Sequence, residues 1–530
     1  MNREKSGFPS KKSKENAVLL LSRGKRGLLQ IVFGRAGLVI LLLILQVFVL
    51  YAAFFRLLGQ NSVLLYTGGS AIAIVMALAV VNRRHQNPSV KLTWVVLILA
   101  VPIFAIPLYF FVNMELGHRL AHHRHEDIKK KTAPLVKQDQ TALSALPGGS
   151  RSLAEYMWQQ GDFPVCRNTT ATYYPLGDDV FQELLNQLEK AEHFIFLEYF
   201  IIEEGYMWGR ILRILEQKVQ AGVEVRVLYD GTCAFAHLPY DYNKQLEAIG
   251  IRCKMFAPLR PLVSTHYNNR DHRKILVIDG KVAFTGGINL SDEYINRIVL
   301  HGHWKDNAIL VRGEAVRSFT LMFLQMWNTE EWNLEDCAPY LKVFPAEGQG
   351  LFIPYGSCPY DDERLAEMVY IDLINRAQRY VHITTPYLVI DNEMATALTF
   401  AAKRGVDVAL ILPHIPDKKY MFALAKTYYP QLLEAGVRIF EYTPGFVHAK
   451  VLVSDGCRAV VGTINFDYRS LYLHFECGVY MEDAPAVGQV EQDFLDTLTK
   501  CQEATLAQWK ARSLGSRLTG YILRLFAPLL

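Results

Sequence analysis

The stretch His272-Arg-Lys274-Ile-Leu-Val-Ile-Asp279 is followed by six residues and then by Gly-Gly-Ile-Asn289. The pattern H-x-K-x4-D-x6-G-x-x-N begins again at residue 448, 176 positions after the first copy. One His beside one Lys can bind a phosphate, and two such pairs that face each other can cut and rejoin a phosphodiester without a metal. A single copy is a weak signal, whereas two copies with the same internal spacing are a strong one.

The spacing of the motif has a structural reason. Residues 272–279 are rich in branched apolar side chains and end at the turn Asp279-Gly280, which is typical of a β-strand. Alternate residues of a strand point to the same face, so His272 and Lys274 share a face, as His448 and Lys450 do in the second copy. The bland alternative is a pair of structural hairpins in which the His and the Lys are incidental.

The segment after each strand completes the candidate site. Gly-x-x-Asn suits a second strand whose backbone comes close to a ligand, and Asn289 and Asn465 each offer an amide to a phosphate oxygen. Asp279 and Asp455 belong to the same motif and are grouped with the catalytic residues. Because they close their strands, we expect them to hold the motif together rather than to touch phosphorus. No metal site accompanies the motifs, and no cofactor is expected.

The duplication extends beyond the motif. Ala221-Gly-Val-Glu-Val-Arg-Val matches Arg404-Gly-Val-Asp-Val-Ala-Leu, and Leu246-Glu-Ala-Ile-Gly-Ile-Arg matches Leu433-Glu-Ala-Gly-Val-Arg. Each copy runs helix, buried strand, helix, strand, helix, strand and motif hairpin. This order predicts an α/β fold of two lobes with pseudo-twofold symmetry, with helices on both faces of each sheet and one His-Lys pair from each lobe in a shared cleft. We expect the lobes at 151–345 and 346–510.

Composition agrees with two such lobes. The 530 residues leave room for two cores and accessory segments. The eight cysteines show no C-x-x-C and no zinc spacing, so we interpret them as thiols. The histidines of Gly117-His-Arg-Leu-Ala-His-His-Arg-His-Glu126 could bind a metal, but a cationic patch at a membrane surface is the better interpretation, within a basic juxtamembrane linker at 114–150.

The N-terminal region has a different character. Residues 1–35 hold nine Lys/Arg and two Asp/Glu, a balance of +7 in a chain whose net charge is +4, and they form a basic tail. Three apolar runs follow, at 36–55, 62–81 and 92–112, each about the length of a transmembrane helix. The basic tail favours a cytoplasmic N-terminus, yet basic residues after the third run favour the same side, so the side of the lobes stays open. The number of true spans, two or three, also stays open.

The C-terminal segment 511–530 is amphipathic. Leu518, Tyr521, Ile522 and Leu525 fall at helical spacing, with arginines beside them. A helix lying in the membrane interface and a helix packed on the protein's own surface both fit this pattern.

Taken with the membrane runs, the two motifs resemble those of the phospholipase D superfamily, and within it the bacterial cardiolipin synthases. The resemblance rests on Asn269-Arg-Asp-His-Arg-Lys-Ile-Leu-Val-Ile-Asp-Gly280, Gly286-Gly-Ile-Asn-Leu-Ser-Asp-Glu-Tyr294 and Gly462-Thr-Ile-Asn-Phe-Asp-Tyr-Arg-Ser470, and it covers roughly residues 90–530. The sequence departs from the family pattern at two points. It has three apolar runs where many relatives have two, and His474 where many relatives carry Asn.

The resemblance implies a reaction in which two phosphatidylglycerols give cardiolipin and glycerol through a phosphohistidine. It implies His272 as the nucleophile and His448 as the acid and base, although the residues alone are symmetric on this. Lys274, Lys450 and the two asparagines would stabilise charge on the phosphate. It also implies Asp306 and Glu476 as the acids that fix the tautomers of the histidines. The partners would be phosphatidylglycerol and membrane lipids, and the location a bacterial cell membrane, with several spans.

Other functions remain open at this stage. A phospholipase that transfers to water and a transferase that uses another alcohol, such as serine or phosphatidylethanolamine, share the same chemistry. A nuclease is disfavoured because residues 36–530 carry a net charge of −3, whereas nucleic-acid binders show a basic surface. A non-catalytic membrane scaffold would be expected to carry a damaged motif, and both motifs are intact. The sequence does not determine the oligomeric state.

Overall fold

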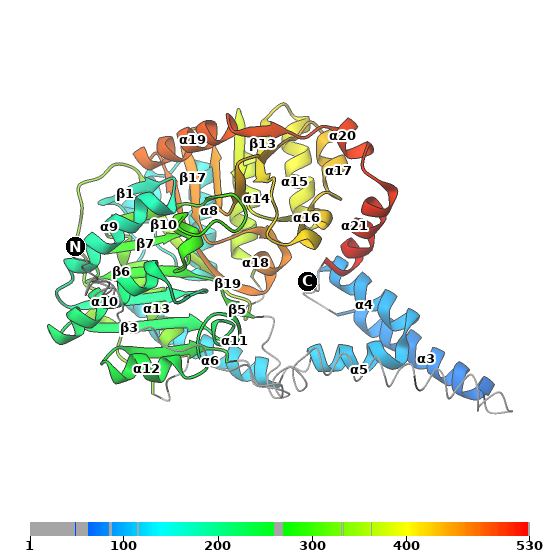
Figure 1. The fold of residues 1–530 in the computed structure, drawn as a ribbon, viewed down its shortest axis with the longest axis horizontal. Coiled ribbons are helices and arrows are strands. Elements are labelled where there is room, and N and C mark those ends of the chain that lie inside the picture. The colour runs from blue at the N-terminus through cyan, green and yellow to red at the C-terminus, as the bar shows by residue number, and fades with distance from the viewer. Residues whose placement is uncertain are drawn as a thin grey trace, which may run out of the picture.

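The computed structural model describes residues 48, 62–83, 87–113, 116–258, 269–329, 331, 333–361 and 363–527. Figure 1 shows two α/β lobes side by side and an arm of N-terminal helices that extends from them. The mixed α/β class predicted from the sequence is confirmed by this arrangement.

The first lobe is built on a seven-stranded sheet in the order β1-β9-β7-β6-β2-β3-β4. Strands β2, β3 and β4 are parallel, and the other neighbours are antiparallel. Strands β2 and β6 are buried along their whole length, which explains why they read as apolar runs without alternation. The bounds are β1 Thr169–Tyr174, β2 Phe194–Tyr199, β3 Glu224–Asp230, β4 Arg252–Phe256, β6 Lys274–Ile278, β7 Val282–Gly286 and β9 Ala308–Gly313.

Helices cover both faces of this sheet. One core lies between the sheet and the helices that connect its parallel strands, and a second core lies between the sheet, α13 and the second lobe. The amphipathic spacing of α9 and α10 turns their apolar stripes toward the first of these cores. The bounds are α9 Gly177–Glu189, α10 Tyr206–Gln220, α11 Cys233–Ala236, α12 Tyr242–Ala248, η3 Asp292–Ile295, α13 Val316–Asn328 and η4 Ala338–Tyr340.

The second lobe repeats the first strand for strand. Its sheet runs β10-β19-β17-β16-β11-β13-β14-β20, and the first seven positions match the strand order of the first lobe. The internal duplication inferred from the sequence is therefore a duplication of topology. The bounds are β10 Leu351–Ser357, β11 Tyr380–Thr384, β13 Asp407–Pro413, β14 Arg438–Tyr442, β16 Val451–Ser454, β17 Arg458–Gly462, β19 His474–Glu482, β20 Cys501–Glu503, α14 Leu365–Arg376, α15 Asn392–Lys403, α16 Lys419–Ala425, α17 Tyr429–Glu434, α18 Tyr468–Tyr472 and α19 Pro485–Leu498.

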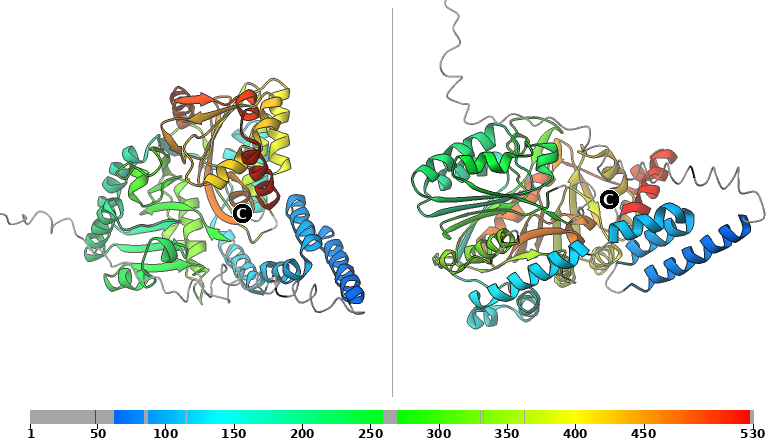
Figure 2. Two further views of the ribbon diagram at one scale, coloured as in Figure 1. Left: turned by 45° about the vertical axis from the view of Figure 1, so that its right-hand side comes forward. Right: turned by 90° about the horizontal axis from the view of Figure 1, so that it is seen from below.

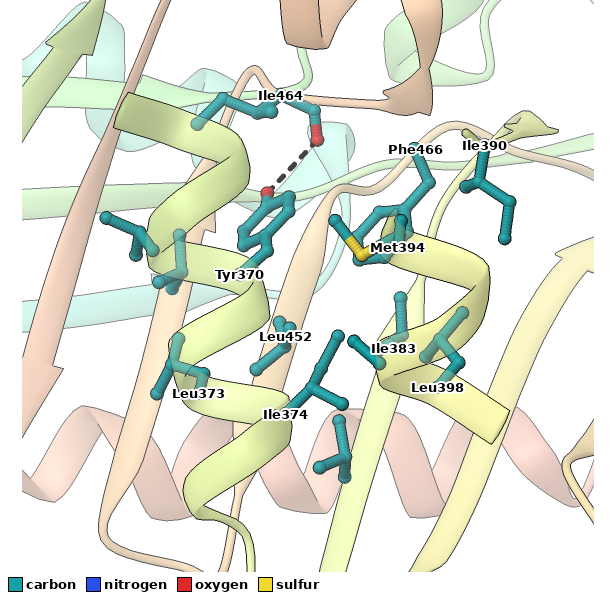
Figure 3. Packing of buried hydrophobic residues seen from close by; sticks show 14 of the residues in the cluster. Tyr370, Leu373, Ile374, Ile383, Ile390, Met394, Leu398, Leu452, Ile464 and Phe466 are labelled. Atoms are coloured by element: carbon teal, nitrogen blue, oxygen red, sulfur yellow. Dashed lines mark hydrogen bonds between the residues drawn. The ribbon is translucent and has the colours of Figure 1, made fainter. Parts of the chain in front are cut away.

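The core of the second lobe also shapes the segment that follows the second motif. Figure 3 shows Tyr370 of α14 and Phe466 in the apolar layer against the sheet, with Met394 of α15 beside them. The rings of Tyr370 and Phe466 stack with centroids 4.8 Å apart. The Tyr370 hydroxyl donates to the carbonyl of Ile464 at 3.2 Å, so a core residue holds the backbone immediately before Asn465.

The two lobes exchange helices across their interface. Helix α13 packs against β10 of the second lobe, and α19 packs against β1 of the first. The Tyr173 hydroxyl on β1 donates to Asp493 on α19 at 2.7 Å, and the Tyr173 amide donates to Gln489 at 3.0 Å. Apolar residues from both sheets meet in one shared core between these helices. The lobes are therefore one packed body with an internal pseudo-twofold.

The segment predicted as a linker is folded onto the lobes. Helix α6 (Leu116–Thr132) packs against α13, followed by η2 (Ala133–Leu135), α7 (Gln140–Ala145) and α8 (Gly148–Gly161). The His125 ring lies 5.9 Å from Phe475, and burial, followed by the charge of Arg273, lowers the pKa of His125 to about 3. The low pKa disfavours a charge on His125, and the cationic patch of this segment stays a prediction. Most of helix α8 lies in the range predicted for the first lobe, yet it packs against the second.

The N-terminal arm contains α3 (Ser62–Val81), α4 (Pro88–Ala100) and α5 (Pro102–Asn113). The run predicted at 92–112 is not one helix. It breaks at Val101, because Pro102 has no N–H and disfavours the helical conformation of the residue before it. Within the described part of the chain, no helix has both the length and the hydropathy needed to cross a bilayer. The run at 36–55 lies outside the described residues except for Phe48.

Polar contacts dock α4 onto the second lobe. The Asn87 amide donates to the Tyr472 hydroxyl at 2.9 Å and to Asp391 at 3.3 Å, and the Thr93 hydroxyl donates to the carbonyl of Leu525 at 2.7 Å. The C-terminal helices α20 (Leu506–Lys510) and α21 (Leu514–Phe526) follow the second lobe. Figure 2 shows α21 beside α4 in both views.

Helix α21 fits both interpretations of the C-terminal segment, packing on the protein and contact with a membrane interface. Its Gly520 lies against Thr427 and the backbone of Ala423 at the end of α16, so one face packs on the protein. The other face leaves large apolar side chains exposed, at Leu514, Leu518, Tyr521 and Ile522.

Candidate active site

Each motif hairpin turns through an Asp-Gly pair with positive φ. Asp279 and Gly280 have φ of 54° and 65°, and Asp455 and Gly456 have φ of 56° and 74°. This is the type I′ geometry that suits the twist of a hairpin. The strands before the turns, β6 and β16, are buried at the centres of the two sheets. The His-x-Lys segments lie at the N-terminal ends of these strands, at the boundary between the lobes.

Short strands bring each histidine against the opposite lobe. Strand β5 (Arg270–Asp271), just before His272, pairs with the start of β19, and the His272 amide donates to the carbonyl of Phe475 at 2.9 Å. Strand β15 (Gly445–Val447), just before His448, pairs with β8 (His303–Lys305), and the His448 amide donates to the carbonyl of Lys305 at 2.7 Å. The two arrangements are equivalent under the pseudo-twofold.

Each imidazole bonds to a carboxylate from the other lobe. His272 Nδ1 lies 2.9 Å from Glu476 Oε1, and His448 Nδ1 lies 2.7 Å from Asp306 Oδ2. Both carboxylates are fully buried. Because an ionised carboxylate only accepts, Nδ1 carries the proton and the lone pair of the neutral ring is on Nε2. The two acids that the resemblance implied therefore reach the histidines, and they do so with the lobes exchanged.

The two lysines of the motifs are buried beside the histidines. Lys274 Nζ donates to the carbonyl of His272 at 2.6 Å, and Lys450 Nζ donates to the carbonyl of His448. Burial lowers the pKa of Lys274 to about 8 and that of Lys450 to about 7. An anionic phosphate between them would offset this desolvation and favour the charged ammonium.

Burial and the nearby lysines also act on the histidines. Burial first, and then Lys274, lowers the pKa of His272 well below its usual value. Burial and Lys450 lower the pKa of His448 to about 4. Burial alone would raise the pKa of Asp306. The nearby His448 and Lys450 have a larger effect, so the pKa of this carboxyl is lowered. Burial and the lysines therefore favour the neutral form of His272, as a nitrogen nucleophile requires, whereas the charge of Asp306 favours the protonated form of His448.

The two asparagines are not equivalent. Asn289 accepts from the Ile201 amide at 3.1 Å and donates to the Tyr294 hydroxyl at 2.7 Å, so both ends of its side chain are engaged. Asn465 is buried as well, and its Oδ1 has no hydrogen-bond partner among the described residues. Asn465 is thus free to turn toward a ligand, whereas Asn289 would have to release Tyr294 first.

Two residues of the site were not singled out from the sequence. The Tyr294 ring lies 5.5 Å from His448, and the Thr463 hydroxyl donates to Glu476 and so fixes one of its oxygens. Both fall inside stretches that carry the resemblance, but neither has a motif of its own. Trp304 and Phe446 complete an aromatic wall beside His448, with ring centroids 5.5 Å and 5.9 Å away.

The two motif aspartates lie away from the histidines. Asp279 accepts from the backbone amides of residues 192–194 at 2.7–2.9 Å, and Asp455 accepts from those of residues 378–380 at 2.8–3.1 Å. Each carboxylate follows a strand that separates it from its motif lysine by about 16 Å. A catalytic role for these two aspartates stays a prediction. Their contacts tie the motif hairpin to the start of the neighbouring strand, which agrees with the expectation that they hold the motif together.

We expect Asp279→Ala to destabilise the protein by roughly 2–4 kcal/mol, because three backbone amides, one of them buried, lose a charged acceptor. Transfer per folded molecule should stay within a few-fold of the wild type. Denaturant unfolding of the purified chain and activity normalised to folded protein would measure the two effects. Asp241→Ala, at an exposed site, is the control. A large loss of turnover at unchanged stability would support a catalytic role for Asp279.

Comparisons with known proteins agree with this geometry. The family described as "Cardiolipin synthase, PLD-like domain" matches residues 184–327 and 370–498, and "Phospholipase_D-nuclease N-terminal" matches residues 71–112. The chain is 34% identical over 483 residues to a cardiolipin synthase of Geobacillus kaustophilus, which covers 90% of this chain and 95% of that protein. It is 51% identical over 458 residues to an uncharacterized protein of Streptococcus mutans, with 86% and 99% covered.

A solved structure shows the same fold at low identity. The phosphatidylserine synthase of Haemophilus influenzae aligns with a TM-score of 0.55 at 14% identity, covering 71% of this chain and 97% of that one. The fold and the paired His-Lys site define the class of phospholipase-D-like enzymes. Within that class, the chain belongs to the cardiolipin synthase family. The family resemblance inferred from the two motifs is confirmed, and so is the expectation of an enzyme of lipid biosynthesis.

Proposed function

We propose that this chain transfers a phosphatidyl group from one phosphatidylglycerol to another, giving cardiolipin and free glycerol. The observation that carries the proposal is the pair of exchanged contacts, His272 with Glu476 and His448 with Asp306. Two oriented imidazoles suit a reaction in which one attacks and the other moves protons. The family model and the curated relatives named as cardiolipin synthases support the choice of substrate.

The reaction proceeds in two displacements. Nε2 of His272 attacks phosphorus, and the bond from phosphorus to the glycerol oxygen breaks. His448 gives its proton to that oxygen, from the protonated form that Asp306 and the bound anionic phosphate favour. Glycerol leaves, and a phosphatidyl-histidine remains. His448 then takes the proton of the primary hydroxyl of a second phosphatidylglycerol, whose oxygen attacks phosphorus as the bond to His272 breaks. Lys274, Lys450 and Asn465 bind the non-bridging oxygens in both steps.

Water must be kept from the intermediate, because hydrolysis would yield phosphatidic acid. The aromatic surroundings support this requirement. The Phe200 ring lies 4.9 Å from His272, and Tyr294 and Trp304 each lie 5.5 Å from His448. An apolar wall leaves water few hydrogen-bonding partners near phosphorus.

Attachment to a membrane would supply the second lipid. The proposal of a cell-membrane location with several spans rests on the apolar runs at 36–55, 62–81 and 92–112 and on the matched N-terminal family model. Large apolar side chains of the described arm are exposed, among them Ile74, Leu78, Leu92 and Leu99. Helix α21, which also exposes apolar side chains, lies next to α4 (Figure 2). We propose that these faces contact lipid.

A loop beside the cleft supports the same orientation. Ile298, Val299 and Leu300 are three consecutive exposed apolar residues. The next residue, His301, lies against Trp304 and Phe446, which flank His448. Exposed apolar residues at the mouth of a lipid-binding site suit insertion into the acyl region.

Lipid mass spectrometry of a host that lacks cardiolipin tests the function. Expression of the full chain should restore cardiolipin, and expression of His272→Ala should not. Phosphatidic acid as the main product would indicate a hydrolase. A phosphatidyl ester of a different alcohol would keep the mechanism and change the acceptor.

The covalent step has its own test. We expect His448→Asn, which lacks the group that activates the second alcohol, to accumulate a phosphatidyl group on His272. Peptide mass spectrometry after exposure to labelled phosphatidylglycerol would locate it, and the double variant His272→Ala/His448→Asn should carry no label. Label on His448 of the wild type, with none on His272, would mean that the two roles are reversed.

A further inference from the structure

His474 lies at the start of β19 and takes no part in the transfer just described. It stands two residues before Glu476, so strand alternation puts both side chains on one face. Its side chain is about nine-tenths buried, and neither ring nitrogen has a hydrogen-bond partner among the described residues. A buried imidazole without partners costs free energy unless some ligand satisfies it.

The unpartnered ring faces the nucleophile and its acid. His474 Nδ1 lies 3.7 Å from Glu476 Oε1, and the centroids of the His474 and His272 rings are 5.5 Å apart. One donor atom from each of His272, His474 and Glu476 lies within 4.8 Å of the other two. Donors around a four-coordinate zinc ion are about 3.3 Å apart, so small side-chain rotations would close the set.

We propose that His272, His474 and Glu476 form a binding site for a transition-metal ion of the zinc class, and that the bound ion silences the enzyme. Two imidazoles and one carboxylate are a donor set that zinc accepts, with a fourth position open to water or a phosphate oxygen. The binding half of this proposal stands on geometry alone. The silencing half rests on the proposed role of His272 as nucleophile.

The silencing follows from the tautomer of His272. Without a metal, Nδ1 donates its proton to Glu476 and Nε2 keeps the lone pair that attacks phosphorus. A metal on Nδ1 takes the place of that proton, which moves to Nε2. The ring stays neutral, no proton leaves it, and the lone pair needed for attack is gone.

The surroundings predict which ions act. Lys274 and Lys450 are close enough to His272 to oppose additional positive charge. Hard cations such as Mg²⁺ and Ca²⁺ prefer six or more oxygen ligands, and a single carboxylate does not offset this repulsion. Zn²⁺, Ni²⁺ and Co²⁺ gain more from two imidazoles. We therefore expect Zn²⁺, Ni²⁺ and Co²⁺ to inhibit transfer, and Mg²⁺ and Ca²⁺ at equal concentration not to inhibit it.

Cobalt and zinc provide the test on the purified full-length protein. After chelation, transfer should be fully active, and added Zn²⁺ should inhibit it reversibly. His474→Asn, which keeps an isosteric polar group, should raise the half-inhibitory zinc concentration at least about tenfold. The control is His414→Asn, which removes an exposed histidine from a comparable His-Glu pair with Glu441 and should leave zinc sensitivity unchanged.

The second readout does not depend on turnover. Co²⁺ should give the visible absorption of a low-coordinate site in the wild type and in His414→Asn, and this absorption should be lost in His474→Asn. Identical spectra in all three proteins, or equal zinc sensitivity of wild type and His474→Asn, would overturn the proposal. If the wild type makes no cardiolipin, the cobalt spectrum still decides whether the site exists.

Discussion

Replacing His272 by alanine is expected to lower phosphatidyl transfer by at least about 10⁴-fold, and replacing His448 should have an effect of the same order. One variant lacks the atom that attacks phosphorus, and the other lacks the group that protonates glycerol and activates the second alcohol. Because both groups act in one sequence of steps, losing either costs nearly as much as losing both.

The measurement is the rate of cardiolipin formation in vesicles of phosphatidylglycerol, with folding checked by circular dichroism. His193→Ala, which alters an exposed histidine, is the control and should keep full activity. Transfer within a hundredfold of wild type by either active-site variant would refute the two-histidine mechanism.

The acids that hold the histidines should matter almost as much. Asp306→Asn and Glu476→Gln are each expected to reduce transfer by about 10³–10⁴-fold while the fold is kept. A neutral amide can donate its N–H to Nδ1, which moves the ring proton to Nε2 and removes the lone pair from the reacting side. The shape of the site hardly changes, so the loss would come from the tautomer.

Because each acid bonds to a different histidine, Glu476→Gln and Asp306→Asn should affect different steps of the reaction. Glu476→Gln should prevent labelling of His272 by phosphatidylglycerol, because it disables the nucleophile. Asp306→Asn disables His448 and should therefore allow slow labelling but delay the loss of label. The matched control is Glu491→Gln, since Glu491 pairs with His382 at 3.0 Å, away from the active site. Equal labelling by both acid variants would show that the acids do not act on separate histidines.

Local pattern was enough to predict most of the fold. The apolar strands, the connecting helices and the Asp-Gly turns follow from residues close in sequence. Because the pattern occurs twice, each of these predictions had two independent stretches of sequence to support it. The break at Val101-Pro102 could also have been inferred, since proline has a fixed effect on the residue before it. It was hidden by the unbroken hydropathy of 92–112.

The exchange between the lobes could not be predicted in this way. His272 and Glu476 are 204 positions apart, and His448 and Asp306 are 142 apart. No periodicity connects such distant residues, and the resemblance named the acids without assigning each to its histidine. The packing of α8 on the second lobe is another contact of this kind. The sequence of an amphipathic helix shows which face is buried but not which other element buries it.

The exchange of acids has a consequence for the growing chain. The ribosome completes the first lobe, with His272 and Lys274, well before it adds Glu476. The nascent first lobe therefore holds a histidine whose proton is not yet positioned. Reactivity arises only after β19 of the second sheet is in place, so the order of synthesis keeps a half-made chain from acting on phosphodiesters.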